Sequence, residues 1–379
     1  MFSIQRETIY LTLAGSHAHG TAREDSDVDL RGVCIAPLSD RLSLFSHFEQ
    51  YEGPLFAELA VAAMGRLAAH PTAVRCLDVK AECAVFDIAK FIGLCAEANP
   101  NALEILFADE RDWVIESPAW MRLHDERHRF LTRKVRHTFL GYAMAQLKRI
   151  KTHRSSLLNP PKHRPARQDF GLPASSGTFG QDDRNRIEKS IADKVRGYRI
   201  DDLEMPQAVR IAVHERMEEF FCDVLAATQD DVEDRQREVA SRALSLPSDV
   251  TAALNAERRY RAAMKHWDSY QKWKSQRNPT RAETERRYGY DTKHAMHLIR
   301  LMRMGLEVLQ TGELLVRRPD AAELNAIRDG ALSFDDLLVD AARLADAMET
   351  AAPRPTLSDD VDRAFVDALL FGLVCDRFQ

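Results

Sequence analysis

Apolar residues follow strand periodicity near the start of the chain and helical periodicity over most of the remainder. Residues 9–14 and about 28–36 form two apolar runs that predict strands, separated by a Gly-Ser turn and a polar stretch. Residues 56–69 have the apolar spacing of a helix, and residues 73–82 read as a third strand. Residues 87–106 predict another helix. The N-terminal part is therefore expected to combine a small sheet with flanking helices.

From about residue 113 onward the pattern predicts almost only helices. Residues 159–173 contain four prolines, cannot be regular structure and interrupt this helical region. Residues 180–256 predict charged amphipathic helix, which ends near the Pro-Ser break at residues 246–249. Helices are then predicted at about 257–276, 288–303, 321–327, 334–348 and 359–371.

These patterns predict an α+β protein, in which a small mixed sheet is followed by a large helical region that walls a cleft. A length of 379 residues suggests two domains, or one domain with a large appendage. We predict a sheet domain at 1–115, a basic helix and Pro-rich connector at 116–180, and a helical domain that closes the cleft at 181–379.

The composition is that of an ordinary globular protein and leaves nucleic-acid binding to local features. Apolar residues make up 45%, and 53 basic against 58 acidic residues give a net charge of −5. The six cysteines form no C-x-x-C pair, so we expect reduced, buried thiols and not a zinc site. No secretory signal or membrane-spanning apolar run is found, which predicts a cytoplasmic protein with no membrane partner. The sequence does not predict an oligomeric state.

The start of the second strand carries two carboxylates. Asp27 and Asp29 flank Val28, and alternate residues of a strand share a face, so both carboxylates point the same way. They repel each other unless a cation lies between them, and oxygen-only ligands suit Mg²⁺ or Mn²⁺. Upstream, the small Gly15-Ser16 turn lets backbone N–H groups and the Ser16 hydroxyl approach an anion. Together they predict one site for a nucleoside triphosphate.

Each half of this site has a plainer interpretation, because Gly-Ser is often only a turn and D-x-D is often a solvated strand end. The combination at this spacing is far more specific. It runs through Gly15, Ser16, Gly20, Ser26, Asp27, Asp29, Arg31, Gly32 and Val33. This pattern resembles the DNA polymerase β-like nucleotidyltransferase superfamily, and most closely its RNA-repair-associated (RlaP-like) family. The resemblance extends over residues 82–107, 157–173 and 257–345, with a second strong segment at 288–312, and the N-terminal motif is its most specific part.

The resemblance implies a polymerase β-like catalytic domain that uses two Mg²⁺ or Mn²⁺ ions and a nucleoside triphosphate. Asp27 and Asp29 would bind both ions, and a third acid would complete the acceptor side and help to deprotonate the attacking hydroxyl. In the family pattern the third acid lies about five residues before a helix, and this spacing favours Glu82 over Asp78, although the family usually has Asp at this position. The alternative is that Glu82 is an exposed charge at a strand end. The nucleotide-binding residues would be Gly15, Ser16, Ser26, Arg31, Lys293, His297 and Arg300.

Lys293, His297 and Arg300 are also linked by spacing alone. At i, i+4 and i+7 they share one face of the helix predicted at 288–303 and could hold a triphosphate across the cleft. The alternative is a surface face with a core histidine. An aromatic stripe on the helix at 257–276 could stack on RNA bases, but such a stripe is more often core.

Residues 133–168 contain ten basic residues and no acid, in a chain that is acidic overall. A run of charge is usually a solvated face, but this one is better explained by a polyanion, and a nucleic-acid backbone or a triphosphate would both qualify. The predicted RNA-binding residues are Lys148, Arg149, Lys151 and Arg154.

The sequence therefore predicts transfer of a nucleoside monophosphate from a triphosphate to a hydroxyl, with an RNA end as the expected acceptor and pyrophosphate released. Two alternatives remain open. One is nucleotidylylation of a protein or a small molecule, which needs no long basic tract. The other is a non-catalytic nucleotide- or RNA-binding module. The sequence does not indicate which nucleotide is used.

Overall fold

A computed structural model describes residues 2–377 apart from 25, 46, 68–69, 71–72, 75–76, 78–80, 175–184, 188, 191–192, 194–247, 277–278 and 352–356. The chain divides into two compact units. Unit 1 comprises Met1–Leu158 and Asn278–Gln379, and unit 2 comprises Asn159–Arg277.

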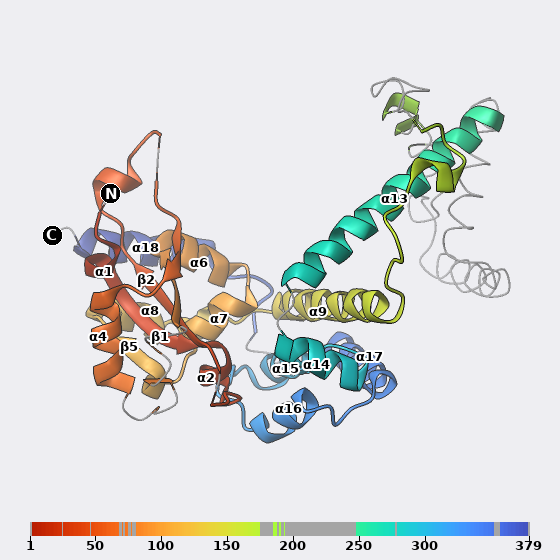
Figure 1. Ribbon diagram of the computed structural model, residues 1–379. Coiled ribbons are helices and arrows are strands. Elements are labelled where there is room, and N and C mark those ends of the chain that lie inside the picture. Colours follow the sequence, from red (N-terminus) through yellow and green to blue (C-terminus); the bar gives the residue numbers. More distant parts are fainter. Residues whose placement is uncertain are drawn as a thin grey trace. The chain divides into compact units, whose positions relative to one another are not determined.

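A five-stranded mixed sheet forms the centre of the N-terminal half of unit 1, with strand order β3-β4-β2-β1-β5 (Figure 1). The strands are β1 (Thr8–Ala14), β2 (Val28–Cys34), β3 (Gln50–Pro54), β4 (Ala81–Asp87) and β5 (Trp113–Ile115). β2 and β4 pair in parallel, and the other neighbours pair antiparallel. This sheet and the helices that follow it confirm the predicted α+β class.

The helices of unit 1 lie before, between and after the strands. They are α1 (Ile4–Glu7), α2 (Gly15–His19), α3 (Leu38–Arg41), α4 (Ala57–Arg66), α6 (Ile88–Ala96), α7 (Pro100–Leu106), α8 (Pro118–Asp125), α9 (Val135–Leu158), α14 (Pro279–Tyr288), α15 (Thr292–Thr311), α16 (Ala321–Arg328), α17 (Phe334–Thr350) and α18 (Arg363–Arg377). Short 3₁₀ turns lie at Glu110–Asp112 and Arg127–Phe130. Among the described helices, none is both long and apolar enough to cross a bilayer.

Two apolar clusters hold the sheet from its two faces. The smaller one packs Leu13 and Leu30 of the sheet with Leu59 of α4. The larger one joins the other face to α6–α9 and to α15–α17, and in it Tyr10 stacks on Trp120 with ring centroids 3.5 Å apart. Because α9 and α15 belong to this one core, the C-terminal segment is packed onto the N-terminal sheet.

These packing relations explain why the compact units differ from the domains predicted at 115/116 and 180/181. Helix α9 packs along α15, so the chain on both sides of residues 159–277 shares one core. The assignment of separate roles to residues 1–115, 116–180 and 181–379 stays a prediction.

Two predicted elements differ from those observed in the first hundred residues. The strand predicted over 73–82 is wrong, because Ala73, Val74 and Leu77 are helical and the strand is β4. Ala73 and Leu77 are buried four residues apart, which is helical spacing. The predicted helix at 87–106 is two helices, α6 and α7.

The break between α6 and α7 follows from Asn99-Pro100. Pro100 has no N–H to donate, and its ring disfavours a helical conformation at the residue before it, so it begins a helix readily but interrupts a continuous one. The Asn99 side chain caps α7 by accepting from the N–H of Asn101 at 3.0 Å.

Further along, β5 is a short strand where almost only helix was predicted. The helix predicted at 257–276 begins nine residues earlier, as α13 (Ser248–Gln276) directly after Pro247. Most of the helix predicted over 180–256 lies outside the described residues.

Unit 2 contains α13 and a 3₁₀ turn at Arg167–Phe170. Arg167 forms an ion pair with Glu257 at 2.9 Å, and Phe170 contacts Tyr260 with ring centroids 5.8 Å apart. The aromatic residues Tyr260, Trp267, Tyr270 and Trp273 of α13 are all only partly buried.

Candidate active site

A cavity of about 1080 Å³ lies within unit 1, between the sheet and the helices α9 and α15. Its wall includes residues of β1, β2, β3, β4, α2, α7, α9 and α15. It is large enough for a nucleotide with part of a second molecule, since sites for small ligands usually measure about 300–1000 Å³.

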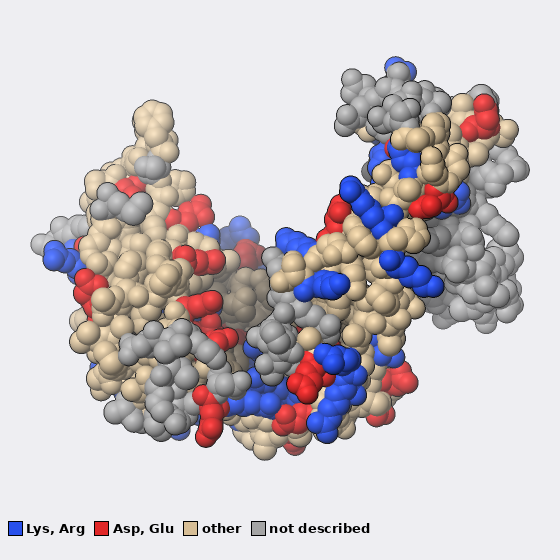
Figure 2. All heavy atoms as spheres, in the orientation of Figure 1, with Lys and Arg blue, Asp and Glu red and all other residues tan. Residues whose placement is uncertain are grey.

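One wall of the cavity is acidic. Asp29 of β2 and Glu82 of β4 are register partners in the parallel strand pair, and both line the cavity. Asp27 is exposed and lies just before β2, two residues from Asp29 as predicted. On the face drawn in Figure 2, acidic side chains gather over the strand part of unit 1. The register thus places Glu82 beside Asp29, whereas the alternative third acid, Asp78, lies outside the described residues.

The acidic wall depends on a close approach by Gly15. This residue begins α2 directly after β1 and has φ = +59°, in the left-handed region. A Cβ at this position would lie 2.5 Å from Oδ2 of Asp29, so a side chain there would displace the carboxylate. Arg31 holds the same carboxylate from the other direction, with Nη2 donating to Oδ1 at 3.2 Å. Ala14 and Asp29 are register partners, which brings the turn and the acid together.

The two predicted serines lie in the loop between β1 and β2. Ser16 is in α2, and its carbonyl accepts from the N–H of Thr21 at 2.9 Å. Ser26 is buried, and its hydroxyl accepts from the N–H of Arg23 at 2.8 Å. Ser26 therefore fixes the turn that leads to Asp27, and any contact of either serine with a nucleotide stays a prediction.

A second wall of the cavity is basic. Lys293, His297 and Arg300 line it from α15, as their shared helical face predicted, and Arg149 lines it from α9. Arg149 is exposed and forms no ion pair with an acidic side chain among the described residues. Oppositely charged walls of one cavity suit a metal-bound polyphosphate.

Arg300 is buried and belongs to a charge network that the sequence patterns did not predict. Its Nη1 donates to Oε1 of Glu104 on α7, and Nε2 of His19 on α2 lies 3.0 Å from Oε2 of the same carboxylate. Burial alone would raise the pKa of Glu104, but the charge of Arg300 and the hydrogen bonds from both partners hold that pKa well below its usual range. Glu104 is therefore ionised at neutral pH.

The histidines of this region are kept neutral. Burial and the positive charge of Arg300 lower the pKa of His19, and the same two causes lower the pKa of His297. A neutral His19 that donates from Nε2 satisfies the second oxygen of Glu104. The motif over residues 99–106 includes Glu104, but its partners at 19 and 300 are too distant in sequence for spacing to reveal the contact.

The four predicted RNA-binding residues of α9 lie on different faces of the helix. Lys148 and Lys151 are exposed, and Arg149 lines the cavity. Arg154 instead donates to the carbonyl of Gly289 at 2.9 Å, and its guanidinium lies 4.4 Å from the centroid of the Phe334 ring. A role in RNA binding stays a prediction for all four, and the contacts of Arg154 give it a packing role as well.

The predicted acid trio, Asp27, Asp29 and Glu82, does not form a closed metal-binding cluster. Among the described residues, the His, Cys, Asp and Glu side chains whose ligand atoms all lie within 4.8 Å of one another are a different group: His153, Asp291 and His294. Asp29 and Glu82 line an open cavity, as carboxylates do when ions and substrate phosphates complete the shell, whereas Asp27 is exposed and is not among the lining residues. Their metal binding stays a prediction.

The Gly15 contact can be tested with a matched glycine. Gly15→Ala and Gly20→Ala both place a side chain at positive φ, which costs about 1–2 kcal/mol, but a Cβ at Gly20 meets nothing closer than 3.7 Å. We expect Gly15→Ala to lower the free energy of unfolding, measured by urea denaturation, by clearly more than Gly20→Ala. Equal losses would contradict the close approach to Asp29.

The neutral histidines predict a fall in stability at mildly acid pH. The pKa values of His17, His19, His124 and His297 are all lowered, mainly by burial, so the unfolded chain binds protons that the folded chain does not as pH falls through about 6.5. From pH 7.5 to 6, each histidine that stays neutral removes about 0.8 kcal/mol. Burial raises the pKa of Asp112 to about 6, so protonation of Asp112 in the folded state opposes this trend as the pH approaches 6 and more strongly below it.

The measurement is urea denaturation at several pH values between 7.5 and 6, with His297→Gln expected to flatten the slope. A free energy of unfolding that stays constant or rises over this interval would contradict the neutral state of the buried histidines.

A comparison with known protein families supports the resemblance inferred from the Gly-Ser and acid-pair pattern. A family model described as RlaP, RNA repair pathway DNA polymerase beta family, matches residues 3–158, which contain the whole sheet, the acid trio and α9. Searches of curated proteins and of solved structures gave no match. The resemblance over residues 257–345 stays a prediction, but the N-terminal match confirms the family inferred from the Gly-Ser and acid-pair pattern. It supports a nucleotidyltransferase-type role in an RNA repair pathway. Residues 3–158 are thus similar to the RNA repair pathway DNA polymerase beta family.

Proposed function

We propose that the protein is a metal-dependent nucleotidyltransferase that moves a nucleoside monophosphate from a nucleoside triphosphate to a hydroxyl at an RNA end. The observation that carries this proposal is the pair of oppositely charged walls of one cavity. Asp29 and Glu82 line it from adjacent strands, and Arg149 and Lys293 line it from α9 and α15. A triphosphate with a divalent ion needs both kinds of group at once.

Asp27, Asp29 and Glu82 fit Mg²⁺ or Mn²⁺ as ligands. All three offer only carboxylate oxygens, and two of them are neighbours in strand register at the cavity wall. When bound, such ions supply charge neutralisation and in-line positioning of the phosphoryl group. Arg31 shares the Asp29 carboxylate, and we propose that it turns toward the nucleotide phosphates when the carboxylate takes up an ion.

The other residues of the cavity have separable roles in this proposal. The backbone N–H groups at Gly15 and the Ser16 hydroxyl hold the β- and γ-phosphates, and Lys293 neutralises charge on the departing pyrophosphate. The acceptor hydroxyl oxygen forms a bond to the α-phosphorus while the bond from that phosphorus to the bridging oxygen breaks. The hydroxyl proton passes to Glu82. Arg300 acts differently, because its buried ion pair with Glu104 supports α15 and so positions Lys293.

An RNA acceptor is supported by the family and by the exposed cations of α9. Lys148 and Lys151 are exposed on the helix whose Arg149 lines the cavity, so a polyanion that follows α9 would lead its end into the site. The basic tract contains no acidic residue over 133–168.

The direct test incubates the purified protein with each α-labelled nucleoside triphosphate in turn, Mg²⁺ or Mn²⁺, and total cellular RNA. Products are separated on denaturing gels and treated with RNase or protease. We expect label in RNase-sensitive material, which would also identify the nucleotide. Label in protein would replace the RNA acceptor with a protein acceptor, and absence of label and of pyrophosphate release would contradict catalysis.

The acid pair gives the sharpest variants for this assay. Asp27→Asn and Asp29→Asn keep the size of each side chain but remove its negative charge. A neutral amide cannot replace a carboxylate as a ligand for the ions. Loss of several kcal/mol of transition-state stabilisation lowers turnover by on the order of 10³-fold. Asp125→Asn, an exposed acid at the end of α8, is the matched control and is expected to keep full activity. Turnover that survives in Asp29→Asn would contradict the mechanism.

The RNA contact of α9 can be tested by its salt dependence. The triple variant Lys148→Gln/Arg149→Gln/Lys151→Gln removes up to three phosphate contacts, which for single-stranded RNA lowers the slope of log affinity against log salt by about 2. Arg6→Gln/Arg343→Gln/Arg363→Gln removes the same charge from exposed positions on α1, α17 and α18. Filter binding at several salt concentrations measures both slopes. Equal slopes for the two triple variants would contradict the proposal that α9 contacts RNA.

A further inference from the structure

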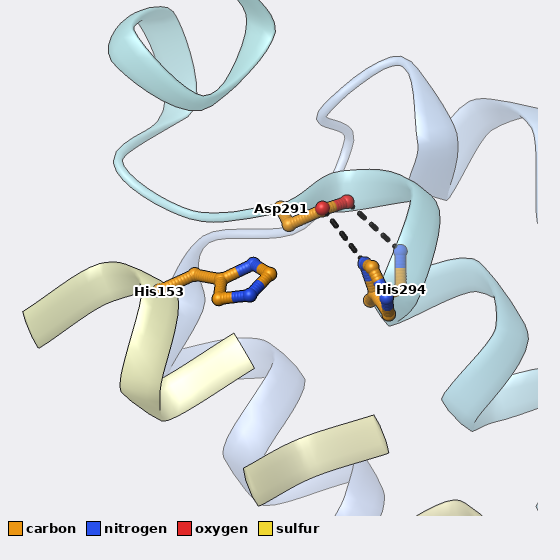
Figure 3. A group of neighbouring side chains, drawn as sticks. All are labelled: His153, Asp291 and His294. Atoms are coloured by element: carbon orange, nitrogen blue, oxygen red, sulfur yellow. Dashed lines mark hydrogen bonds and ion pairs between the residues drawn. The ribbon is translucent and has the colours of Figure 1, made fainter. Parts of the chain in front are cut away.

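A cluster of three ligand-type side chains lies where α9 packs against the start of α15, apart from the acid trio. The ligand atoms of His153, Asp291 and His294 all lie within 4.8 Å of one another. His153 comes from α9, and the other two come from the first turn of α15 and the residue before it, as Figure 3 shows. Nδ1 of His294 is 2.7 Å from Oδ2 of Asp291, and the two imidazole ring centroids are 5.7 Å apart.

We propose that His153, Asp291 and His294 bind one transition-metal ion of the Zn²⁺ class, which joins α9 to α15. Two imidazoles and one carboxylate are a typical ligand set for Zn²⁺ and similar ions, whereas Mg²⁺ and Ca²⁺ prefer oxygen ligands alone. The chemistry therefore differs from that of the carboxylates at Asp27, Asp29 and Glu82. The absence of a C-x-x-C pair does not bear on this site, because it contains no cysteine.

The neighbouring contacts hold the ligands in place without an ion. Asp291 is the N-cap of α15, and its Oδ1 accepts from the N–H of His294 at 3.0 Å, so its buried carboxylate is oriented by the helix. Thr292 donates from its hydroxyl to the carbonyl of Arg328 at 2.7 Å and fixes the same turn. On α9, Arg154 donates to the carbonyl of Gly289, which ties the residue after His153 to the segment before Asp291. Ligands that are positioned in advance lose little entropy on binding.

The proposed site also borders the catalytic cavity. His294 lines the cavity and Lys293 precedes it, so an ion at this place would add positive charge to the basic wall. Three protein ligands leave a fourth position of a tetrahedral ion for water. The ion would fix the position of α9, which carries Arg149, relative to α15, which carries Lys293. This inference does not depend on the proposed reaction, because it concerns binding alone.

The test measures Zn²⁺ binding by the full chain after treatment with a chelator, using competition with a chromophoric chelator. The measurement is made in an Asp29→Asn/Glu82→Gln background, so that ions held by the acidic wall do not contribute. We expect one Zn²⁺ per chain and a rise in the unfolding temperature on adding Zn²⁺, because an ion that binds the folded state stabilises it. Co²⁺ in place of Zn²⁺ is expected to give the absorption of a four-coordinate site.

Three variants of the cluster are compared in this background: His153→Gln, His294→Gln and Asp291→Asn. Each is expected to weaken Zn²⁺ binding by more than about tenfold, since loss of even an outer-shell partner costs 10–100-fold. Asn at position 291 can still cap α15, so this variant keeps the fold while it removes the charge. His47→Gln, at an exposed position, is the control and is expected to bind as the background does.

The proposal is overturned if the background protein binds no Zn²⁺, or if the cluster variants bind it as tightly as His47→Gln. It is also overturned if Zn²⁺ raises the unfolding temperature of the cluster variants as much as that of the control. The three side chains would then form only an Asp291–His294 pair with a histidine ring packed beside it.

Discussion

The buried ion pair between Arg300 and Glu104 connects the C-terminal helices to the N-terminal half of unit 1. Arg300 lies on α15 and Glu104 on α7, and His19 of α2 hydrogen-bonds to the same carboxylate. A charge removed from water is stable only when it is paired, and loss of one partner from such a pair costs about 3–5 kcal/mol. Residues that are almost 200 positions apart are thus held in contact by electrostatics as well as by the apolar core. The position of α15 over the cavity depends on this pair.

The placement of α15 gives the cavity its two oppositely charged walls. The sheet supplies Asp29 and Glu82 through strand register, and α15 supplies the cation Lys293. Neither element alone brings both kinds of charge to the cavity. Gly15 then determines how close the turn after β1 comes to Asp29, because a side chain there would occupy the place of the carboxylate oxygen. The site is therefore a product of contacts between three distant segments of the chain.

The parts of the fold that were predictable are those in which local pattern and tertiary packing agree. β1 and β2 are apolar and bounded by turn residues, and Ser333 caps α17 by accepting from the N–H of Asp336, as a Ser before an acidic turn predicts. The strand predicted at 73–82 failed because buried residues spaced by four can also satisfy a loose strand pattern. β5 was missed because three residues are too few to show a period.

The site was predictable where it follows a local motif and not where it depends on long-range contact. Spacing within 70 residues predicted a common site for Gly15, Asp29 and Glu82, and these three residues line one cavity, as do the three polar residues predicted to share one face of α15. The roles of all these residues stay predictions. The pairing of Glu104 with His19 and Arg300 could not be found in this way, since each residue is an ordinary member of its own helix. The same holds for His153 beside Asp291 and His294, which meet only because α9 packs along α15.

In the proposed function, the two walls hold one metal-bound triphosphate between them. The most direct measurement is a crystal structure with Mn²⁺ and a nucleoside triphosphate analogue that cannot be cleaved at the α–β bridge, with the ions located by anomalous scattering. We expect Mn²⁺ peaks among Asp27, Asp29 and Glu82, with the phosphates between them and Lys293. A nucleotide bound outside this cavity, or Mn²⁺ absent from the three carboxylates while the nucleotide is bound, would contradict it.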